Sequence, residues 1–266
     1  MHPFVSLFVS AITVTLVQLG GLLGVFFFIG TILSIVQSKT HKGYHAIFGW
    51  YGILWTAWIG TPIHELSHVF FAKIFGHNVH KISLFKPNKQ TGSLGHIDHS
   101  FDSSSLYQRI GNFFVGCAPL IGGSVFLYGL LFFLFPTGKD VITMLPQTLI
   151  WPESLHAIIN ALLFAITSAS FLHWQIWLFI YLSLAIASHL APSKADRKNM
   201  WEGLGYIAGA LLVVNVIASA LSRDVTTLVL GTTKYTQLLV VMFIWALALS
   251  ILHWLAITVL RIALGK

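Results

Sequence analysis

Long apolar runs separated by short polar connections make up most of this chain. A helix rises about 1.5 Å per residue, so roughly 20 apolar residues span the hydrocarbon core of a bilayer. The pattern predicts an all-α, multi-pass membrane protein with about six transmembrane helices. The apolar runs cover residues 1–38, 47–75, 110–135, 156–190, 200–221 and 238–260.

Two of these runs need interpretation. The first carries no formally charged side chain over 1–38 and far exceeds the ~7–15 apolar residues of a signal peptide, so we expect a retained membrane segment. The run 156–190 is longer than one crossing requires and carries the polar residues Ser168 and His173. We interpret it as one crossing with an interfacial first part; two short elements are the alternative.

The segment between the second and third runs has a different character. Val79, Lys81 and Ser83 alternate with residues of the opposite face, and a turn-rich stretch follows over 87–92 before a second short run. This alternation is typical of strands joined by a loop. The pattern predicts a small β-hairpin over 79–99, directly after the second apolar run, as the one strand-like part of the chain.

Composition narrows the class of protein. Of the 266 residues, 56% are hydrophobic and only 9% are charged, whereas soluble domains carry about a quarter charged residues. So little charge does not cover a water-exposed surface, and lipid-facing helices need none. We therefore expect one integral membrane domain over 1–266, in contact with a lipid bilayer.

The net charge of +7 comes from Lys and Arg scattered among the short connections. That distribution is typical of loops beside anionic lipid head groups and argues against nucleic-acid binding. With six crossings, eight basic residues fall on the N-terminal side, including Arg261, and five on the other, including Lys39 and Lys42. This favours a cytoplasmic N-terminus, and the compact chain leads us to expect a bacterial inner membrane.

The main chemical signal is His64-Glu65-Leu66-Ser67-His68. Helical residues four apart share a face, so the two imidazoles can converge on one metal ion. Glu65 is placed to take a proton from water and pass it to a leaving amine. Packed or hydrogen-bonded histidines are the alternative, but a buried Glu65 would then need a partner in a low dielectric. We expect one catalytic Zn²⁺.

Two histidines leave a catalytic zinc one protein ligand short. The extended pattern of soluble zinc proteases is absent, because Phe71 and Ile74 stand where Gly and His would be. Asp196, at the start of the fifth run, is our first choice, because two further crossings return the chain to the side of His64. On local pattern alone, a capping box with Ser193 as the N-cap is the better interpretation.

Other residues compete for the third position, and their simpler interpretations are a solvated loop or a helix end. The competitors are His96, Asp98, His99, Asp102, His189 and Glu202. Thr61, Ser67 and Asn112 are expected to line a wet cavity, with interhelical hydrogen bonding as the alternative. The lone cysteine, Cys117, excludes an intrachain disulfide and a Cys-based zinc site.

Three stretches together resemble the site-2 protease family of intramembrane zinc metalloproteases. Ile63–His68 is followed by Phe71-Ala72-Lys73 and Gly76; Gly116–Gly123 looks like the family's small-Gly-Pro-Leu-x-Asn helix; and Pro192–Asp196 is placed like its aspartate motif. The resemblance covers about a third of the chain, 61–123 and 187–203.

The resemblance implies a zinc ion held by His64, His68 and Asp196, with Glu65 activating water. It also implies a metalloprotease core over about 46–222. The chain departs from the family pattern, since Arg197 follows the aspartate where Gly is usual. A divergent member is therefore expected.

The expected function is zinc-dependent hydrolysis of peptide bonds in membrane-embedded or membrane-adjacent substrates. A substrate segment could add as a strand beside the hairpin, giving sequence-tolerant recognition through the main chain. Two alternatives stay open: a membrane metal transporter, and a proteolytically inactive zinc-binding scaffold. Neither requires a glutamate next to the first ligand, so Glu65 is the residue that separates them from a protease.

Overall fold

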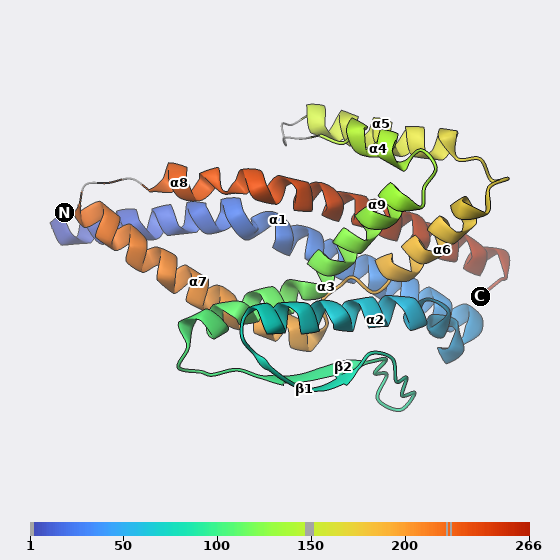
Figure 1. Ribbon diagram of the computed structural model, residues 1–266, viewed down its shortest axis with the longest axis horizontal. Helices are drawn as coiled ribbons and strands as arrows, with labels where there is room; N and C mark the ends of the chain where they lie inside the picture. The colour runs from blue at the N-terminus through green and yellow to red at the C-terminus, as the bar shows by residue number, and fades with distance from the viewer. Residues whose placement is uncertain (1–2, 147–151, 222, 224) are drawn as a thin grey trace.

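The computed structural model describes residues 3–146, 152–221, 223 and 225–266. Within these residues the chain forms nine helices and one two-stranded sheet (Figure 1). In chain order the elements are α1 (Pro3–Phe48), α2 (Trp50–Ile74), β1 (Asn78–Ser83), β2 (His96–Ser100), α3 (Leu106–Phe133), α4 (Gly138–Met144), α5 (Glu153–Ser168), α6 (Trp174–Ala187), α7 (Lys194–Ala220), α8 (Thr226–Gly231) and α9 (Thr233–Ala263).

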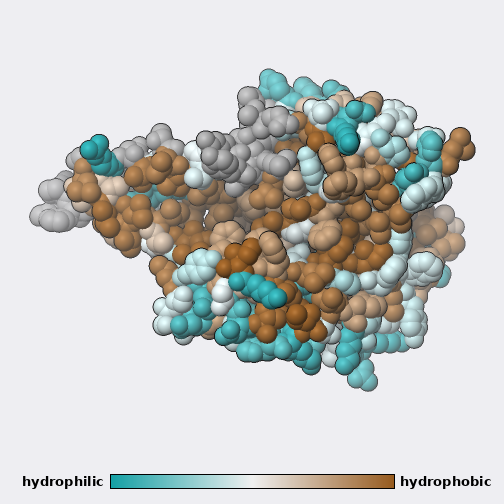
Figure 2. All heavy atoms as spheres, viewed as in Figure 1, coloured by the Kyte–Doolittle hydropathy of each residue, from teal (hydrophilic) through white to brown (hydrophobic). Residues whose placement is uncertain are grey.

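Four of the described helices are long and apolar enough to cross a membrane: α1, α3, α7 and α9. In the most apolar windows of α1 and α7, only 22% and 17% of the residues are buried inside the protein. Their apolar side chains therefore face outward, as lipid-facing helices require. Figure 2 shows apolar side chains over the middle of one face, with hydrophilic ones along the lower rim, where the hairpin lies.

The apolar run 156–190 is not one continuous helix but two short elements, the alternative that the sequence pattern left open. It forms α5, of 16 residues, and α6, of 14 residues, each shorter than the ~20 residues of a spanning helix. The two helices still share a core, because Ala161 and Ala165 of α5 lie in one buried cluster with Ile176 of α6. Further along α6, Ile186 packs beside Leu127 of α3.

The predicted hairpin is confirmed. β1 and β2 are antiparallel, with Ile82 opposite Ile97 and Ser83 opposite His96, and the register is irregular between Val79 and Lys81. The first strand ends at Ser83, and residues 84–95 form the connecting loop. The hairpin lies beside α2 (Figure 1), so the strands follow directly from the helix that carries the histidine pair.

Helix α3 lies at the centre of the bundle. Leu120 is fully buried in a cluster with Leu33 of α1 and Phe243 of α9. Leu127, about two turns further along α3, is fully buried against Leu190, which lies just before α7. The helices that carry the candidate ligands, α2 and α7, both pack against α3 as well.

The predicted single domain over 1–266, with a metalloprotease core over about 46–222, stays a prediction. Residues 1–2 and residue 222, the predicted end of that core, lie outside the described residues.

Helices α1 and α9 run side by side in the same direction along the long axis (Figure 1). Their C-terminal parts therefore share one end of the bundle. Lys39 and Lys42 line the same hollow as Arg261, and the Lys266 ammonium donates to the carbonyl of Ile47 over 2.8 Å. The predicted placement of Lys39 and Lys42 on the side opposite Arg261 is wrong, because it depended on an even number of crossings.

Candidate metal centre

His64, His68 and Asp196 meet at one point, with one donor atom of each lying within 4.8 Å of the others. Nε2 of His64 lies 3.6 Å from Oδ2 of Asp196, and Nε2 of His68 lies 3.3 Å from Oδ1. His68 and Asp196 are buried, and His64 is nearly so. No other described residues form such a group of three or more potential ligands.

The hydrogen bonds of the two imidazoles fix which nitrogen is free. Nδ1 of His64 lies 2.7 Å from the carbonyl of His189, and Nδ1 of His68 lies 2.8 Å from the carbonyl of Val115. A carbonyl oxygen only accepts, so each Nδ1 carries the proton and each neutral Nε2 presents a lone pair. Metal-binding histidines in proteins are oriented by such outer partners.

The side chains of His64, His68 and Asp196 form a buried site that would stabilise a cation. Two imidazole lone pairs and a carboxylate face one another in a buried place, and without a positive charge between them they would repel. Nitrogen from histidine and oxygen from aspartate are donors that zinc takes in proteins. His64, His68 and Asp196 thus form a buried group that could hold a metal ion.

Asp196 caps α7 and also belongs to the group that could hold a metal ion, so its two interpretations do not exclude each other. The backbone N–H of Ser193 donates to Oδ2 over 2.7 Å, and the N–H of Asp196 donates to the Ser193 hydroxyl over 3.2 Å. This reciprocal pair is the predicted capping box at the start of α7. The cap holds the carboxylate in one rotamer, which leaves Oδ1 facing His68.

Glycines of α3 let the two ligand-bearing helices approach. A Cβ atom on Gly122 would overlap the side chain of Ser67 in α2, and one on Gly116 would overlap the backbone of Asp196 in α7. Since glycine has no Cβ, α2 and α7 can both lie directly against α3. This close packing on α3 brings the candidate ligands together.

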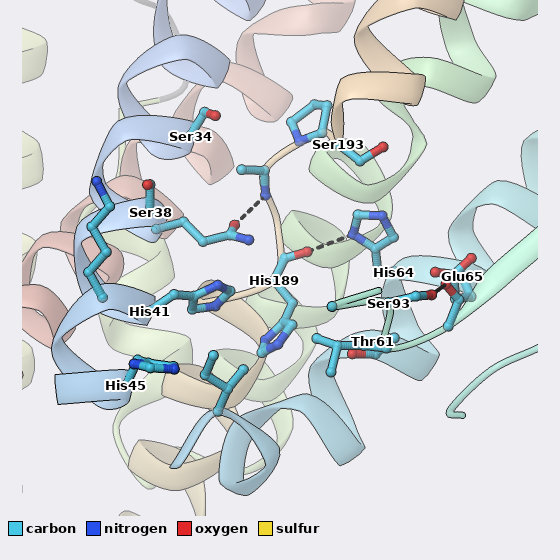
Figure 3. A pocket seen from close by; sticks show the side chains of 18 residues that line it. Ser34, Ser38, His41, His45, Thr61, His64, Glu65, Ser93, His189 and Ser193 are labelled. Atoms are coloured by element: carbon cyan, nitrogen blue, oxygen red, sulfur yellow. Dashed lines mark hydrogen bonds between the residues drawn. The ribbon is translucent and has the colours of Figure 1, made fainter. Parts of the chain in front are cut away.

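A cavity of about 680 Å³ opens beside the three ligands, and both His64 and Glu65 line it. Residues 92–95 of the hairpin loop form part of its wall, and in Figure 3 Glu65 lies next to Ser93. Glu65 itself is buried. The glutamate is thus placed on the cavity side of the candidate ligands rather than among them.

Sequence reasoning missed the polar face of α1. Ser34, Ser38, His41 and His45 recur at helical spacing in the C-terminal part of α1, and all four line the cavity (Figure 3). The sequence does contain this pattern, because the intervals of four, three and four residues between them place the side chains on one helix face. Polar residues on one face of a membrane helix favour a wet interior.

Two side chains of α1 tie down the segment that precedes α7. The Gln37 side-chain oxygen accepts from the N–H of Ala191 over 2.8 Å, and Nε2 of His41 lies 3.0 Å from the carbonyl of Ser188. The same segment supplies the His189 carbonyl that holds His64. Helix α1 therefore positions both one ligand and the approach to Asp196.

Two buried polar atoms in the cavity wall have no partner among the described atoms: Oγ1 of Thr61 and Nε2 of His189. Buried polar atoms normally form hydrogen bonds, so these two are available to whatever enters the cavity. Thr61 thus fits the expected wet cavity. Ser67 instead donates to the carbonyl of Ile63 within its own helix, and Asn112 is fully buried away from the cavity.

The competing ligands lie elsewhere. His96 and Asp98 form an exposed pair on the hairpin, at 3.7 Å. Ser104 donates to the Asp102 carboxylate and lowers its pKa. His99 stacks on His77, and burial lowers the pKa of His99. The remaining two do not join the site: His189 contributes its carbonyl, and Glu202 is exposed.

Comparison with protein-family models, with curated proteins and with solved structures gives no match for this chain.

Proposed function

We propose that this chain is a zinc-dependent endopeptidase that hydrolyses peptide bonds of membrane-embedded or membrane-adjacent substrates. The observation that carries the proposal is the arrangement of His64, His68 and Asp196 around one point, with Glu65 lining the adjoining cavity. A metal ion that only stabilised the fold would not need a buried, ionisable side chain such as Glu65 in the wall of the adjoining cavity.

The donor set fits a catalytic zinc ion. Two imidazole nitrogens and one carboxylate oxygen make three protein ligands, which leaves one position of a tetrahedral zinc for water or substrate. Zinc bound in this way supplies Lewis-acid polarisation of the scissile carbonyl and lowers the pKa of water to about 7. The hydrogen bonds from His64 and His68 to main-chain carbonyls would keep both rings in the required tautomer.

Glu65 provides the proton transfers of the proposed reaction. Its carboxylate takes one proton from the attacking water, and the same proton then goes to the amide nitrogen as the peptide bond breaks. The products are a new carboxyl group and a new amine, and Glu65 returns to its starting state. The position of Glu65 supports this assignment, because the residue is buried and lines the cavity beside the candidate ligands.

The cavity beside the ligands suits an extended peptide. Its wall carries the unpartnered Thr61 hydroxyl and His189 nitrogen, which can bond main-chain groups of a substrate. The two-stranded sheet leaves strand edges free beside α2, so an unwound substrate segment can be held as an added strand. The proposed substrate is therefore a membrane protein or peptide recognised mainly through its backbone.

We further propose that the chain crosses the membrane an odd number of times. The parallel packing of α1 and α9 places the two described ends of the chain at opposite ends of the bundle (Figure 1). Five crossings would account for this: the four long apolar helices α1, α3, α7 and α9, and α2, whose 25 residues are enough to span a bilayer. The shorter α5 and α6 would then be connecting helices. A bacterial inner membrane remains the expected location.

Cleavage is tested by comparing the wild-type protein with Glu65→Gln in bacterial membranes that contain each protein at equal levels. New peptide termini, labelled chemically and identified by mass spectrometry, should appear with the wild type and be absent with Glu65→Gln. Glu202→Gln is the matched control, because Glu202 is exposed and outside the site. Equal sets of termini from wild type and Glu65→Gln would contradict the proposal.

A further inference from the structure

Three cationic side chains gather where the C-terminal parts of α1 and α9 lie side by side. They surround a hollow of about 220 Å³, which we call the basic pocket. Its lining residues are Lys39, Lys42, Gly43, Trp254, Thr258 and Arg261. The apolar runs do not associate these residues, because 39–43 and 254–261 lie more than two hundred residues apart in the chain.

Helix geometry explains why they converge. Trp254, Thr258 and Arg261 follow one another at intervals of four and three residues, which places them on one face of α9. The Cβ that Gly43 lacks would overlap the side chain of Ile257, so glycine allows α1 to lie directly against α9 here. Lys39 then reaches over α9, with its ammonium 4.7 Å from the centre of the Trp254 ring.

The positive charge of the basic pocket is not neutralised within the described protein. No carboxylate lines the hollow, and none of Lys39, Lys42 and Arg261 forms an ion pair with a described residue. Like charges held this close repel one another unless an anion lies between them. The pocket is therefore suited to a ligand with negative charge.

The surroundings indicate where that ligand comes from. Both helices are among the four that are long and apolar enough to cross a membrane, and the cations lie near their ends. Tryptophan beside lysine and arginine is typical of the level of lipid head groups. Exposed apolar residues neighbour the lining residues along both helices: Ile35, 51% exposed, lies one turn before Lys39, and Leu255 and Val259, 45% and 65% exposed, follow Trp254 and Thr258 directly. These offer a surface for acyl chains.

We propose that the basic pocket binds the phosphate of an anionic phospholipid head group, whose acyl chains lie along the apolar surface of α1 and α9. Arginine and lysine are the side chains that hold phosphate, through charge-assisted hydrogen bonds. The hollow is smaller than the ~300–1,000 Å³ of pockets that enclose a drug-sized molecule, so it takes a head group and not a whole lipid.

The site is separate from the candidate metal centre but adjoins it. Lys42 lines both the basic pocket and the large cavity, whereas Lys39 and Arg261 line the basic pocket alone. A bound lipid would therefore border the cavity and steady α1, the helix that holds the segment before α7. The inference does not depend on proteolysis, because lipid binding can be measured without any cleavage assay.

The test uses the full-length protein in a neutral detergent, titrated with short-chain phosphatidylglycerol, with phosphatidylcholine of equal chain length, and with inorganic phosphate. We expect preferential binding of phosphatidylglycerol. Lys39→Gln/Arg261→Gln should weaken that binding roughly 25-fold, about fivefold for each cation removed. Lys139→Gln is the matched control: Lys139 also lies over an aromatic ring, that of Phe132, but outside the pocket.

A charge-conserving variant, Lys39→Arg/Arg261→Lys, should retain the preference and guards against a simple folding defect. Equal affinity for phosphatidylglycerol and phosphatidylcholine would overturn the proposal, as would unchanged binding in Lys39→Gln/Arg261→Gln. Inorganic phosphate that binds as tightly as phosphatidylglycerol, with the same dependence on Lys39 and Arg261, would overturn the assignment to a lipid.

Discussion

Oδ1 of Asp196 lies 3.3 Å from Nε2 of His68, and the other oxygen of the same carboxylate accepts the N–H of Ser193. One side chain thus closes a helix cap and completes a candidate ligand set. The cap orients the carboxylate before any metal arrives, which reduces the entropy lost on binding. The two roles can be separated by substitution.

Asp196→Asn keeps an oxygen that accepts from Ser193, so the cap should persist, but the negative charge between His64 and His68 is lost. We expect zinc affinity to fall by more than the 10–100-fold typical of losing an outer partner, with little change in thermal stability. Ser193→Ala should do the reverse, with a cost of about 1 kcal/mol in stability and zinc retained. Isothermal titration with zinc and thermal unfolding in detergent measure the two effects. The same response in both variants would show that the roles are not separable.

Gly122→Ala tests whether close packing of α2 on α3 assembles the site. The new methyl group would overlap Ser67, which lies between the two histidines. Overpacking of this kind costs about 1–3 kcal/mol, and we expect zinc binding to weaken with it. Gly129→Ala is the control on the same helix, because no atom lies within 4 Å of its new methyl group; it should be neutral or stabilising.

A rescue makes the packing prediction specific. Adding Ser67→Gly to Gly122→Ala removes the overlapping side chain and should restore zinc affinity, measured by the same titration. Failure of the rescue, with the double variant still folded, would mean that Gly122 acts in some other way than by admitting Ser67.

Thr61→Val should separate stability from function. The Thr61 hydroxyl is buried without a partner, so replacing it with a methyl group is expected to stabilise the protein by about 1 kcal/mol. Cleavage should decrease if the hydroxyl bonds the substrate. Thr56→Val is the control: Thr56 lies on the same helix, but its hydroxyl already donates to the carbonyl of Ile53, so no gain is expected. Thermal unfolding and the terminus assay report the two quantities, and a destabilised Thr61→Val would refute the assignment.

The hairpin should loosen in acid. Burial, and then the neighbouring His77, lower the pKa of His99 from its usual 6.5. The folded hairpin therefore binds fewer protons than the unfolded chain, so its stability is fully present above pH 6.5 and decreases as the pH falls below that value. Protection factors of the β1 and β2 amides, which compare the observed exchange rate with the intrinsic rate at the same pH, should be lower about one pH unit below 6.5 than about one unit above it.

Two substitutions identify the group responsible for this pH dependence. His99→Phe keeps a ring against His77 and should remove the dependence. His80→Gln, at an exposed position of β1, should leave it in place. Persistence of the dependence in His99→Phe would assign it to another group.

Much of this fold could be predicted because the deciding interactions are local. The i, i+4 spacing of His64 and His68 places both rings on one face of any helix, and alternation marked the strands of the hairpin. The cap of Ser193 with Asp196 was likewise readable, because both halves lie within one helical turn.

The features of the fold and of the candidate site that could not be predicted depend on contacts between segments far apart in the chain. In the run 156–190, Ser168 and His173 stand at the end of α5 and at the N-cap of α6, but two polar residues alone do not distinguish a break from one long helix. The proximity of Lys39 to Trp254 requires α1 and α9 to be parallel, which apolar run lengths do not specify. The carbonyl that orients His64 belongs to His189, and a backbone partner leaves no trace in the sequence.

The zinc K-edge X-ray absorption spectrum of the purified, gel-filtered protein tests the central claim most directly. The account predicts tightly held zinc with two imidazole nitrogens at about 2.0–2.1 Å, oxygen in the remaining positions and no sulfur, and the loss of one imidazole in His68→Ala. A protein that retains no metal, or a zinc shell with no imidazole, would contradict it.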